Sequence, residues 1–288
     1  MQPNVSVVIC AKDAEKYIDA CIRSLRDQTF TDFEIVIIDD CCCDNTRHVV
    51  EKSDDKRIRY FRNEKNLGIA KSRNLGLRLS RGKFIFFTDA DCIVSKDWID
   101  QGLKSLRNPS CVGVEGKIYY VSREYEPTFS DHIHRNEFGG QFMTGNMAYR
   151  KRVVESVGGC DERYSYHEDR DLALRVLKSG EIDFNPNMIV FVQQQTLTPK
   201  ELIQRAGIIK NRVYLFKRFG EKSSIFWRIV DPLNLAKALF PPLIFASLFF
   251  GRFRTSDDLK LLPFKYVCAV LGRLQLWKTC AKERVFLI

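Results

Sequence analysis

The sequence predicts an α/β fold in which a mostly parallel sheet is flanked by helices, followed by a helical C-terminal region. Three observations lead to this prediction. Short β-branched, apolar runs alternate with segments whose apolar residues recur every three or four positions. Such alternation is typical of βαβ units, whose strands pair in parallel. Acidic residues also follow several of the apolar runs, and ligands of parallel sheets bind at the carboxyl ends of the strands.

The first ninety residues carry the clearest patterns. β-branched and aromatic residues dominate the predicted strands, while the predicted helices bury one apolar stripe. The predicted strands cover residues 5–9, 33–38, 58–61 and 83–87, and the predicted helices cover 14–25, a short segment before residue 58, and 69–79.

After residue 91 the alternation becomes irregular, although further elements are still predicted. They are a helix at 97–106, a strand at 112–120, a polar and aromatic substrate-facing loop at 122–145, a strand at 146–149, a helix at 151–157, a break at Gly158-Gly159, a helix at 167–178 and a strand at 188–192. We expect one globular domain at residues 1–195 and a second region at 196–288.

Charge separates these two regions. From Gln193 onward the chain has 17 Lys and Arg residues against 6 Asp and Glu residues, whereas the preceding part has 29 against 30. A basic, apolar tail favours an anionic partner such as a membrane surface or nucleic acid, and a solvated basic face is the alternative. Residues 198–219 predict a cationic amphipathic helix, typical of a helix on an anionic bilayer surface. Packing of this helix on the domain is equally compatible with the pattern.

An apolar stretch at residues 233–250 strengthens the membrane interpretation. Lys237 and Pro241-Pro242 interrupt it, so a re-entrant or interfacial hairpin fits better than one spanning helix. A second apolar piece covers 264–277, and a buried helical annex is the alternative for both. The N-terminus has no secretory pattern, and the ten cysteines fit reduced thiols. We therefore expect a location on the cytoplasmic side of the cell membrane, peripheral or re-entrant.

Acidic residues gather where the predicted strands end. Asp13 follows the first strand, Asp39-Asp40 the second, and Asp89-Ala90-Asp91 the run at 83–87. Carboxylates that converge on one sheet edge repel each other, and a divalent cation such as Mn²⁺ or Mg²⁺ would compensate them. The two carboxylates of Asp89 and Asp91 can share such an ion with a diphosphate. Alternatively, Asp91 caps the segment that follows it.

Six segments of the chain have the form of sequence motifs: Val5–Asp13, Glu34–Asp40 with Asp44-Asn45-Thr46, Asn66–Gly76, Gly82–Asp91, Gly158–Glu162 and His167–Leu172. Taken together and in this order, these motifs resemble glycosyltransferase family 2, the inverting enzymes with the GT-A (Rossmann-like) fold. The resemblance covers residues 4–195.

The resemblance implies a donor site for a nucleotide-diphosphate sugar, commonly a UDP-sugar. Asp40 would contact the base, while Arg73 would lie near the diphosphate or pair with a carboxylate as scaffold. Asp91 would ligate the metal, together with Asp89. The residues implied on the donor side are Cys10, Lys12, Asp13, Asp40, Arg73, Asp89 and Ala90.

The acceptor side is implied by the motif at 167–172. Asp169 would be the general base that deprotonates the acceptor hydroxyl, with Glu168 as the second candidate; both are otherwise acids favoured in the first turn of a helix. The acceptor would be a glycan or a polyprenyl-linked glycan. Because the family's processive Q-x-x-R-W motif is absent, we expect transfer of a single sugar.

Three positions depart from the family pattern. Cys41-Cys42-Cys43 replaces the usual Gly-Ser-Thr, Lys12 replaces an aromatic residue, and Gln193-Gln194-Gln195 stands where many members have a metal-binding histidine. A catalytically inactive family member, acting as a nucleotide- or membrane-binding module, is therefore the alternative hypothesis.

Two other functional classes fit less well. A dinucleotide-binding oxidoreductase requires G-x-G-x-x-G after the first strand, where this chain has no glycine. A nucleic-acid-binding module leaves the acidic cluster unexplained, so we expect no nucleic acid partner.

Overall fold

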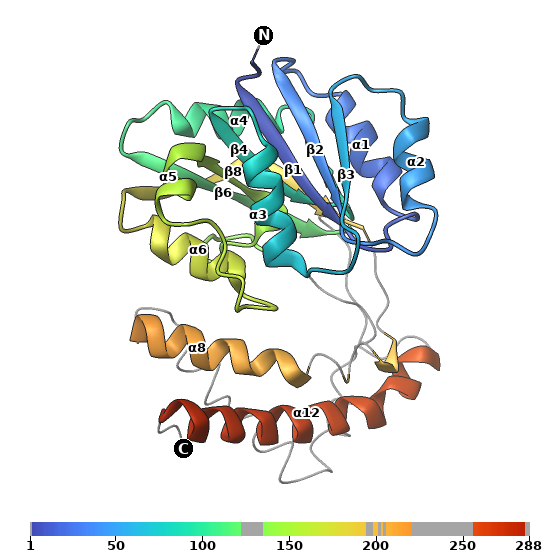
Figure 1. Ribbon diagram of the computed structural model, residues 1–288, viewed down its shortest axis with the longest axis vertical. Coiled ribbons are helices and arrows are strands. Elements are labelled where there is room, and N and C mark those ends of the chain that lie inside the picture. The colour runs from blue at the N-terminus through green and yellow to red at the C-terminus, as the bar shows by residue number, and fades with distance from the viewer. Residues whose placement is uncertain are drawn as a thin grey trace. The chain divides into compact units, whose positions relative to one another are not determined.

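The computed structural model describes residues 2–121, 135–193, 198–200, 203, 206–220 and 256–285. These described residues form two compact units, of which residues 2–121 and 135–193 make up the first and the later residues belong to the second. The first unit is a layered α/β structure with one sheet (Figure 1). The boundary expected at residue 195 remains a prediction.

Eight strands form a single sheet in the first unit, in the order β3-β2-β1-β4-β7-β6-β8-β5. The first four strands of this order run parallel, as the alternating pattern predicts. Strand β7 is antiparallel to both neighbours, and β8 runs parallel to β6 but antiparallel to β5, so the sheet as a whole is mixed. The strands are β1 (Val5–Ala11), β2 (Phe33–Asp39), β3 (Ile58–Arg62), β4 (Phe84–Asp89), β5 (Cys92–Val94), β6 (Cys111–Tyr120), β7 (Met147–Arg150) and β8 (Glu181–Val192).

Helices cover both faces of this sheet. On one face, Leu77, Val154 and Leu172 bring three helices into a single buried cluster with the strands. On the other face, Trp98 packs edge-to-face on Phe86 with ring centroids 5.1 Å apart. The sheet is thus buried on both sides, as its continuous apolar strands require. The helices are α1 (Ile18–Arg26), α2 (Thr46–Lys52), α3 (Ile69–Leu79), α4 (Trp98–Leu106), α5 (Lys151–Ser156) and α6 (Glu168–Val176), with a 3₁₀ turn η1 (Thr144–Asn146).

The structure differs from the sequence-based expectations at several places. Helix α1 begins at Ile18, four residues after its expected start at residue 14. Strand β5 was not expected, and β8 begins at Glu181 instead of residue 188. Asn146 belongs to the 3₁₀ turn and not to a strand. His167 precedes α6 in a left-handed conformation with φ of 69°, so the helix begins one residue later than expected.

The second unit contains two long described helices, α8 (Ile209–Phe219) and α12 (Ser256–Glu283), with a 3₁₀ turn η2 (Ala206–Ile208) before α8. Lys217 of α8 pairs with Glu283 of α12 at 2.7 Å. The apolar piece predicted at 264–277 lies within α12, whereas the stretch at 233–250 lies outside the described residues. Within the described part, no helix has the length and apolar character needed to cross a membrane. Membrane association remains a prediction.

Candidate functional site

The carboxyl ends of three parallel strands lie next to one another in the first unit. Ala11 of β1 pairs with Asp39 of β2, and Cys10 pairs with Asp89 of β4. Asp39 is fully buried, whereas Cys10 and Asp89 are half-buried. Burial raises the pKa of the Cys10 thiol above its usual value, so the sulfur at the centre of this edge stays protonated. The strand ends therefore form the floor of a site with carboxylates on either side.

Arg73 joins two of the predicted motifs. It lies on α3, is only 6% exposed, and its Nη2 is 3.1 Å from Oδ1 of Asp89. Its Nη1 donates to Oε1 of Glu168 at the start of α6. Burial alone would lower the pKa of this guanidinium, but the carboxylates of Glu168 and Asp89 raise it above its usual value. Of the two roles considered for Arg73, this arrangement corresponds to pairing with carboxylates.

Asp169 stands next to this ion pair in the first turn of α6. It is half-buried, and its Oδ1 accepts the Arg170 N–H at 2.7 Å. Burial, reinforced by the neighbouring Glu168 carboxylate, raises the pKa of Asp169 to about 7. A carboxylate with a pKa near neutrality can accept a proton from a substrate and later release it.

Glu168 occupies a different environment from Asp169. It is 4% exposed, and Arg73 neutralises it. Its second oxygen, Oε2, is buried and has no hydrogen-bond partner among the described residues. Because its charge is compensated by a buried cation, Glu168 is the poorer proton acceptor of the two candidates.

Asp89 and Asp91 form the candidate metal site. Ligand atoms of Asp89, Asp91 and Cys92 all lie within 4.8 Å of one another. Two carboxylates suit Mn²⁺ or Mg²⁺, which take further oxygen ligands from phosphates and water. The Cys92 thiol is a soft ligand, and burial raises its pKa well above the usual value, so it fits such an ion poorly. Burial, reinforced by the charge of Asp89, raises the pKa of Asp91 to about 7, and a cation bound between the two carboxylates would favour their ionised forms.

The turn around the two aspartates is tightly enclosed. Ala90 between them is 7% exposed. A Cβ on Gly145 would lie 3.1 Å from Oδ2 of Asp89, so the absence of a side chain lets this turn approach the carboxylate. The N–H of Gln193 donates to the carbonyl of Asp91 at 2.8 Å, while its side-chain Nε2 donates to the Tyr17 carbonyl at 3.0 Å. Gln193 thus closes the turn through its backbone; Gln194 and Gln195 lie outside the described residues.

Asp40 holds the loop that leads into α3. Its carboxylate is 5% exposed and accepts the N–H groups of Leu67 at 2.7 Å and Gly68 at 2.9 Å. The amide of Asn63 donates a third hydrogen bond at 2.8 Å. These contacts account for most of its acceptor capacity. The contact with a nucleotide base that the resemblance implies for Asp40 stays a prediction.

The loops after β1 and β2 are bonded to each other. Lys12 Nζ donates to the Cys41 carbonyl at 2.6 Å, and the Cys43 N–H donates to Asp13 Oδ1 at 2.7 Å. Cys41, which stands where the family has glycine, adopts a left-handed φ of 62°. Lys12 and Asp13 therefore support this altered loop, in addition to any contact with a ligand.

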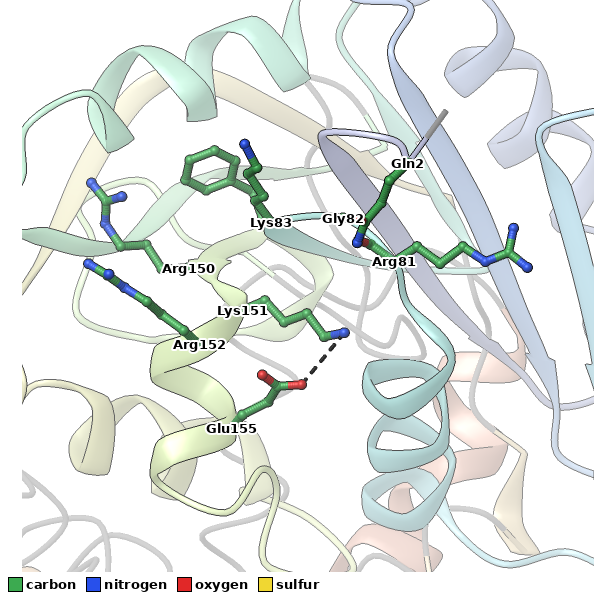
Figure 2. Close-up of a pocket in the computed structure, with 9 residues that line it drawn as sticks. Gln2, Arg81, Gly82, Lys83, Arg150, Lys151, Arg152 and Glu155 are labelled. Carbon is green, nitrogen blue, oxygen red and sulfur yellow. Dashed lines mark hydrogen bonds and ion pairs between the residues drawn. The ribbon is translucent and has the colours of Figure 1, made fainter.

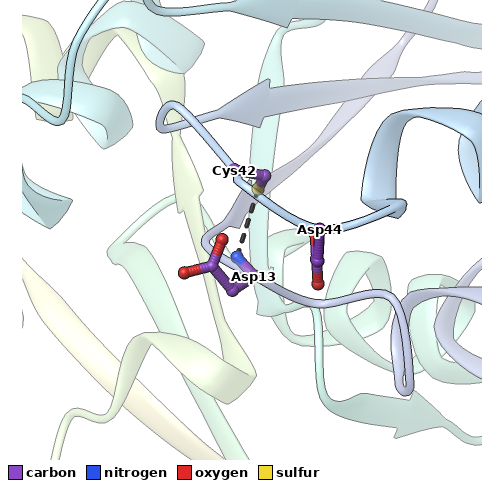
Figure 3. Close-up of side chains that lie close together, drawn as sticks. All are labelled: Asp13, Cys42 and Asp44. Carbon is purple, nitrogen blue, oxygen red and sulfur yellow. Dashed lines mark hydrogen bonds between the residues drawn. The ribbon is translucent and has the colours of Figure 1, made fainter.

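Figure 3 shows Asp13, Cys42 and Asp44 close together between these loops. Their ligand atoms lie within 4.8 Å of one another. However, Cys42 Sγ accepts the Asp13 N–H at 3.2 Å, and burial raises the pKa of this thiol to about 11. Asp44 in turn accepts the N–H of Glu15 at 2.9 Å and the hydroxyl of Thr46. Hydrogen bonding within the protein accounts for this cluster.

Glu115 was not among the predicted site residues. It lies on β6, is 2% exposed, and accepts the N–H groups of Gly140 at 2.6 Å and Gln141 at 2.9 Å. Phe142 N–H and the Asn136 amide donate to the same carboxylate. This loop leads directly to the turn at Gly145 beside Asp89. The only signal in the sequence is an acidic residue inside a largely apolar strand.

We expect Glu115→Gln to lower the free energy of unfolding by about 2 kcal/mol, because the new amide turns a donor toward backbone N–H groups that need an acceptor. Urea denaturation measures the change. Glu64→Gln is the control, since Glu64 is exposed and its replacement should stay within about 0.5 kcal/mol. Equal stability of the two variants would show that Glu115 does not anchor the loop.

Comparison with known proteins completes the description. The profile of the family described as "Glycosyl transferase family 2" matches residues 6–164, more than half of the chain. An uncharacterized glycosyltransferase of Haemophilus influenzae is 35% identical over 147 residues, which span half of this chain and 43% of the relative. The Escherichia coli UDP-Glc:alpha-D-GlcNAc-diphosphoundecaprenol beta-1,3-glucosyltransferase WfaP is 26% identical over 72% of this chain and 86% of its own length.

Two solved structures share the fold. Residues 1–349 of S. aureus TarS, in complex with UDP-GlcNAc, give a TM-score of 0.59 and 18% identity, covering 99% of this chain and 93% of that TarS chain. The mannosyltransferase PcManGT from Pyrobaculum calidifontis, in complex with GDP-Man and Mn²⁺, has a TM-score of 0.62 and 15% identity, covering 99% of this chain and 88% of the other. The mixed sheet with flanking helices is thus the GT-A fold.

Proposed function

Because the chain belongs to glycosyltransferase family 2, we propose that it transfers a single sugar from a UDP-sugar to a lipid-linked glycan, with inversion at the anomeric carbon. One observation carries the proposal: Arg73 bridges Asp89 and Glu168, so the metal-binding turn and the helix that bears Asp169 belong to one site. A donor held at the turn would present its anomeric carbon to an acceptor beside α6.

Asp89 and Asp91 would hold Mn²⁺ or Mg²⁺ together with the donor diphosphate. Bound there, the ion neutralises the charge that develops on the leaving diphosphate. The carboxylate pair beside a buried Arg73 supports this assignment, as does the Mn²⁺ bound with GDP-Man in PcManGT. The loops after β1 and β2, with Cys10, Lys12, Asp13 and Asp40, would surround the nucleotide.

Asp169 would act as the general base. Its carboxylate accepts the proton of the acceptor hydroxyl while the hydroxyl oxygen attacks the anomeric carbon, and the bond between that carbon and the diphosphate breaks. The single displacement from the opposite side inverts the configuration. Its pKa of about 7 supports this role, because an appreciable fraction of the group is ionised near neutral pH and the ionised form is basic enough to accept a proton.

A lipid-linked acceptor and a membrane location belong to the same proposal. WfaP is named for an acceptor on diphosphoundecaprenol, and it covers 72% of this chain. The excess of basic residues after Gln193 would favour an anionic surface. We therefore place the enzyme on the cytoplasmic side of the cell membrane, where polyprenyl-linked glycans would be within reach.

Asp91→Ala is the test of the donor site. We expect the wild-type protein to release UDP from a UDP-sugar in the presence of Mn²⁺ and lipid extract, and the variant to lose at least about 100-fold in rate, because one of two protein ligands is gone. Thermal shift with UDP and GDP, with and without Mn²⁺, reports binding separately from turnover. Asp32→Ala removes an exposed carboxylate at the amino end of β2 and should behave as wild type.

The results also separate an active enzyme from an inactive family member. Stabilisation by a nucleotide and Mn²⁺ without any turnover would indicate a nucleotide-binding module. If no nucleotide stabilises the wild-type protein, the proposed donor site is wrong.

A further inference from the structure

A basic cavity lies at the opposite edge of the sheet, where β1 and β4 begin and β7 ends. Its volume is about 380 Å³. Figure 2 shows the basic side chains that line it, which come from the segment before β4, the end of β7 and the start of α5. It is lined by Gln2, Arg81, Gly82, Lys83, Phe84, Arg150, Lys151, Arg152 and Glu155. Five of these residues are cationic and one is acidic.

Strand pairing and backbone hydrogen bonds bring the backbones of these residues together. Phe84 of β4 lies opposite Arg150 of β7, and the Lys151 N–H donates to the Lys83 carbonyl at 3.0 Å. The backbone of Lys83 is also fixed on its other side, where its N–H donates to the Asn4 carbonyl at 2.9 Å. Like charges on neighbouring strands repel each other, and here the fold holds them in place.

Carbonyl and carboxylate groups of the protein contact two of the five cations. Arg150 donates to the carbonyls of Leu106 at 2.6 Å and Cys111 at 2.9 Å. Lys151 donates to the Ser80 carbonyl at 2.6 Å and lies 3.5 Å from Glu155. These two cations stabilise the framework of the cavity.

The other three cationic side chains are exposed to solvent. Over the ranges that the structure describes, the side chains of Arg81, Lys83 and Arg152 have no hydrogen-bond or ion-pair partner. This excess stands out because residues 1–192 together carry 29 basic against 30 acidic residues. The first unit therefore concentrates positive charge at this edge, while carboxylates occupy the other.

We propose that this cavity binds a phosphate-bearing anion, at a site separate from the donor site. Arg and Lys donors are the groups that recognise phosphate oxygens, and the cavity has room for more than one phosphate group. Six residue steps from Lys83 to Asp89 along β4 separate the two sites by about 20 Å, at about 3.3 Å per residue. An anion bound in the cavity would therefore not compete with a sugar donor bound at the other edge of the sheet. Free phosphates and the phosphate of a lipid headgroup share this chemistry.

The test uses the full chain carrying Asp91→Ala, with EDTA, so that the donor site takes no part. Binding of inorganic pyrophosphate is measured by calorimetry, and binding to vesicles is measured by co-sedimentation with phosphatidylglycerol or with phosphatidylcholine alone. Lys83→Glu/Arg152→Glu reverses two charges at the cavity. Lys52→Glu/Lys56→Glu reverses two exposed charges, one at the end of α2 and one in the turn before β3, and serves as the matched control.

We expect Lys83→Glu/Arg152→Glu to weaken binding at least about tenfold, because two charge-assisted contacts are lost, and the control to remain near the parent. Lys83→Gln/Arg152→Gln should give an intermediate loss. Weakened pyrophosphate binding identifies a free phosphate as the ligand, and weakened binding to phosphatidylglycerol vesicles alone identifies a lipid headgroup. If neither probe distinguishes the cavity variants from the control, the proposed site does not exist.

Discussion

Asp169→Asn is expected to lower kcat of sugar transfer by about 10²- to 10⁴-fold, the range typical for loss of a general base. Asparagine keeps the size and the hydrogen bond of Asp169 Oδ1 to the Arg170 N–H, but it cannot accept the acceptor's proton. The rate is measured with a saturating UDP-sugar and a lipid-linked acceptor. Nucleotide affinity in thermal shift should remain unchanged, because the donor contacts are intact.

The pH dependence of kcat/KM tests the role of Asp169 independently. With the pKa of Asp169 raised to about 7, kcat/KM of the wild type should fall about tenfold per pH unit below pH 7, since only the ionised form accepts a proton. Glu168→Gln should keep a limb of the same slope but move it to lower pH, because the Glu168 carboxylate helps to raise the pKa of Asp169, whereas Asp169→Asn should lose the limb. An unchanged limb in Asp169→Asn would assign the base to another residue.

The contribution of Asp169 to the free energy of unfolding should fall as the pH rises, whereas kcat/KM should rise. The pKa of Asp169 is higher in the folded protein than in the unfolded chain, so folding favours the protonated form. The stability contributed by that proton is present below about pH 4 and is lost as the pH rises through about 7. Above pH 7, Asp169→Asn should therefore be more stable than the wild type. Urea denaturation at pH 8 measures the difference.

Arg73→Met is expected to lower the free energy of unfolding by about 3–5 kcal/mol, the cost of leaving one partner of a buried ion pair uncompensated. Glu168 is 4% exposed, and its Oε2 has no partner to replace the lost cation in the described part of the chain. Activity should fall as well, since Asp89 and α6 lose their link. Urea denaturation gives the stability, and kcat at saturating donor gives the catalytic effect.

Two further variants separate the ion pair from simple packing. Arg73→Met/Glu168→Gln removes both charges and should recover part of the stability lost in the single variant. Arg23→Met removes an arginine that is 70% exposed and paired with Asp19, and should cost no more than about 0.5 kcal/mol. If Arg73→Met is no more destabilising than Arg23→Met, the buried bridge contributes nothing to folding.

The parallel half of the fold could be predicted because each element has its own pattern. The helix predicted at 69–79 has the same ends in the structure, as Gly68 and Ser80 bound a regular apolar stripe. The second half depends on pairings that no local pattern encodes. Strand β5 is three residues long, and the first part of β8 is polar and contains Pro186, yet both are held by neighbours far along the chain.

The candidate site, too, could be predicted from the sequence only in part. Asp89 and Asp91 lie at the edge of the sheet where the parallel strands end. This position could be predicted because both residues directly follow an apolar strand in the sequence. The bridge from Arg73 to Glu168 spans 95 positions in the sequence, so only the tertiary fold reveals that Arg73 pairs with carboxylates. Glu115 was missed because its partners are backbone N–H groups, which every residue except proline carries.

The position of β8 has a consequence for the order of folding. This strand is the last of the first unit to be synthesised, yet it lies between β6 and β5, and its neighbour Gln193 bonds the carbonyl of Asp91. Until residues 181–193 emerge, β5 has no neighbour in the sheet and the turn around Asp91 is open on one side. Pairing over such separations is slow compared with the formation of local βαβ units. The parallel half can thus form early during synthesis, whereas the turn that carries Asp89 and Asp91 is completed only when the last strand enters the sheet.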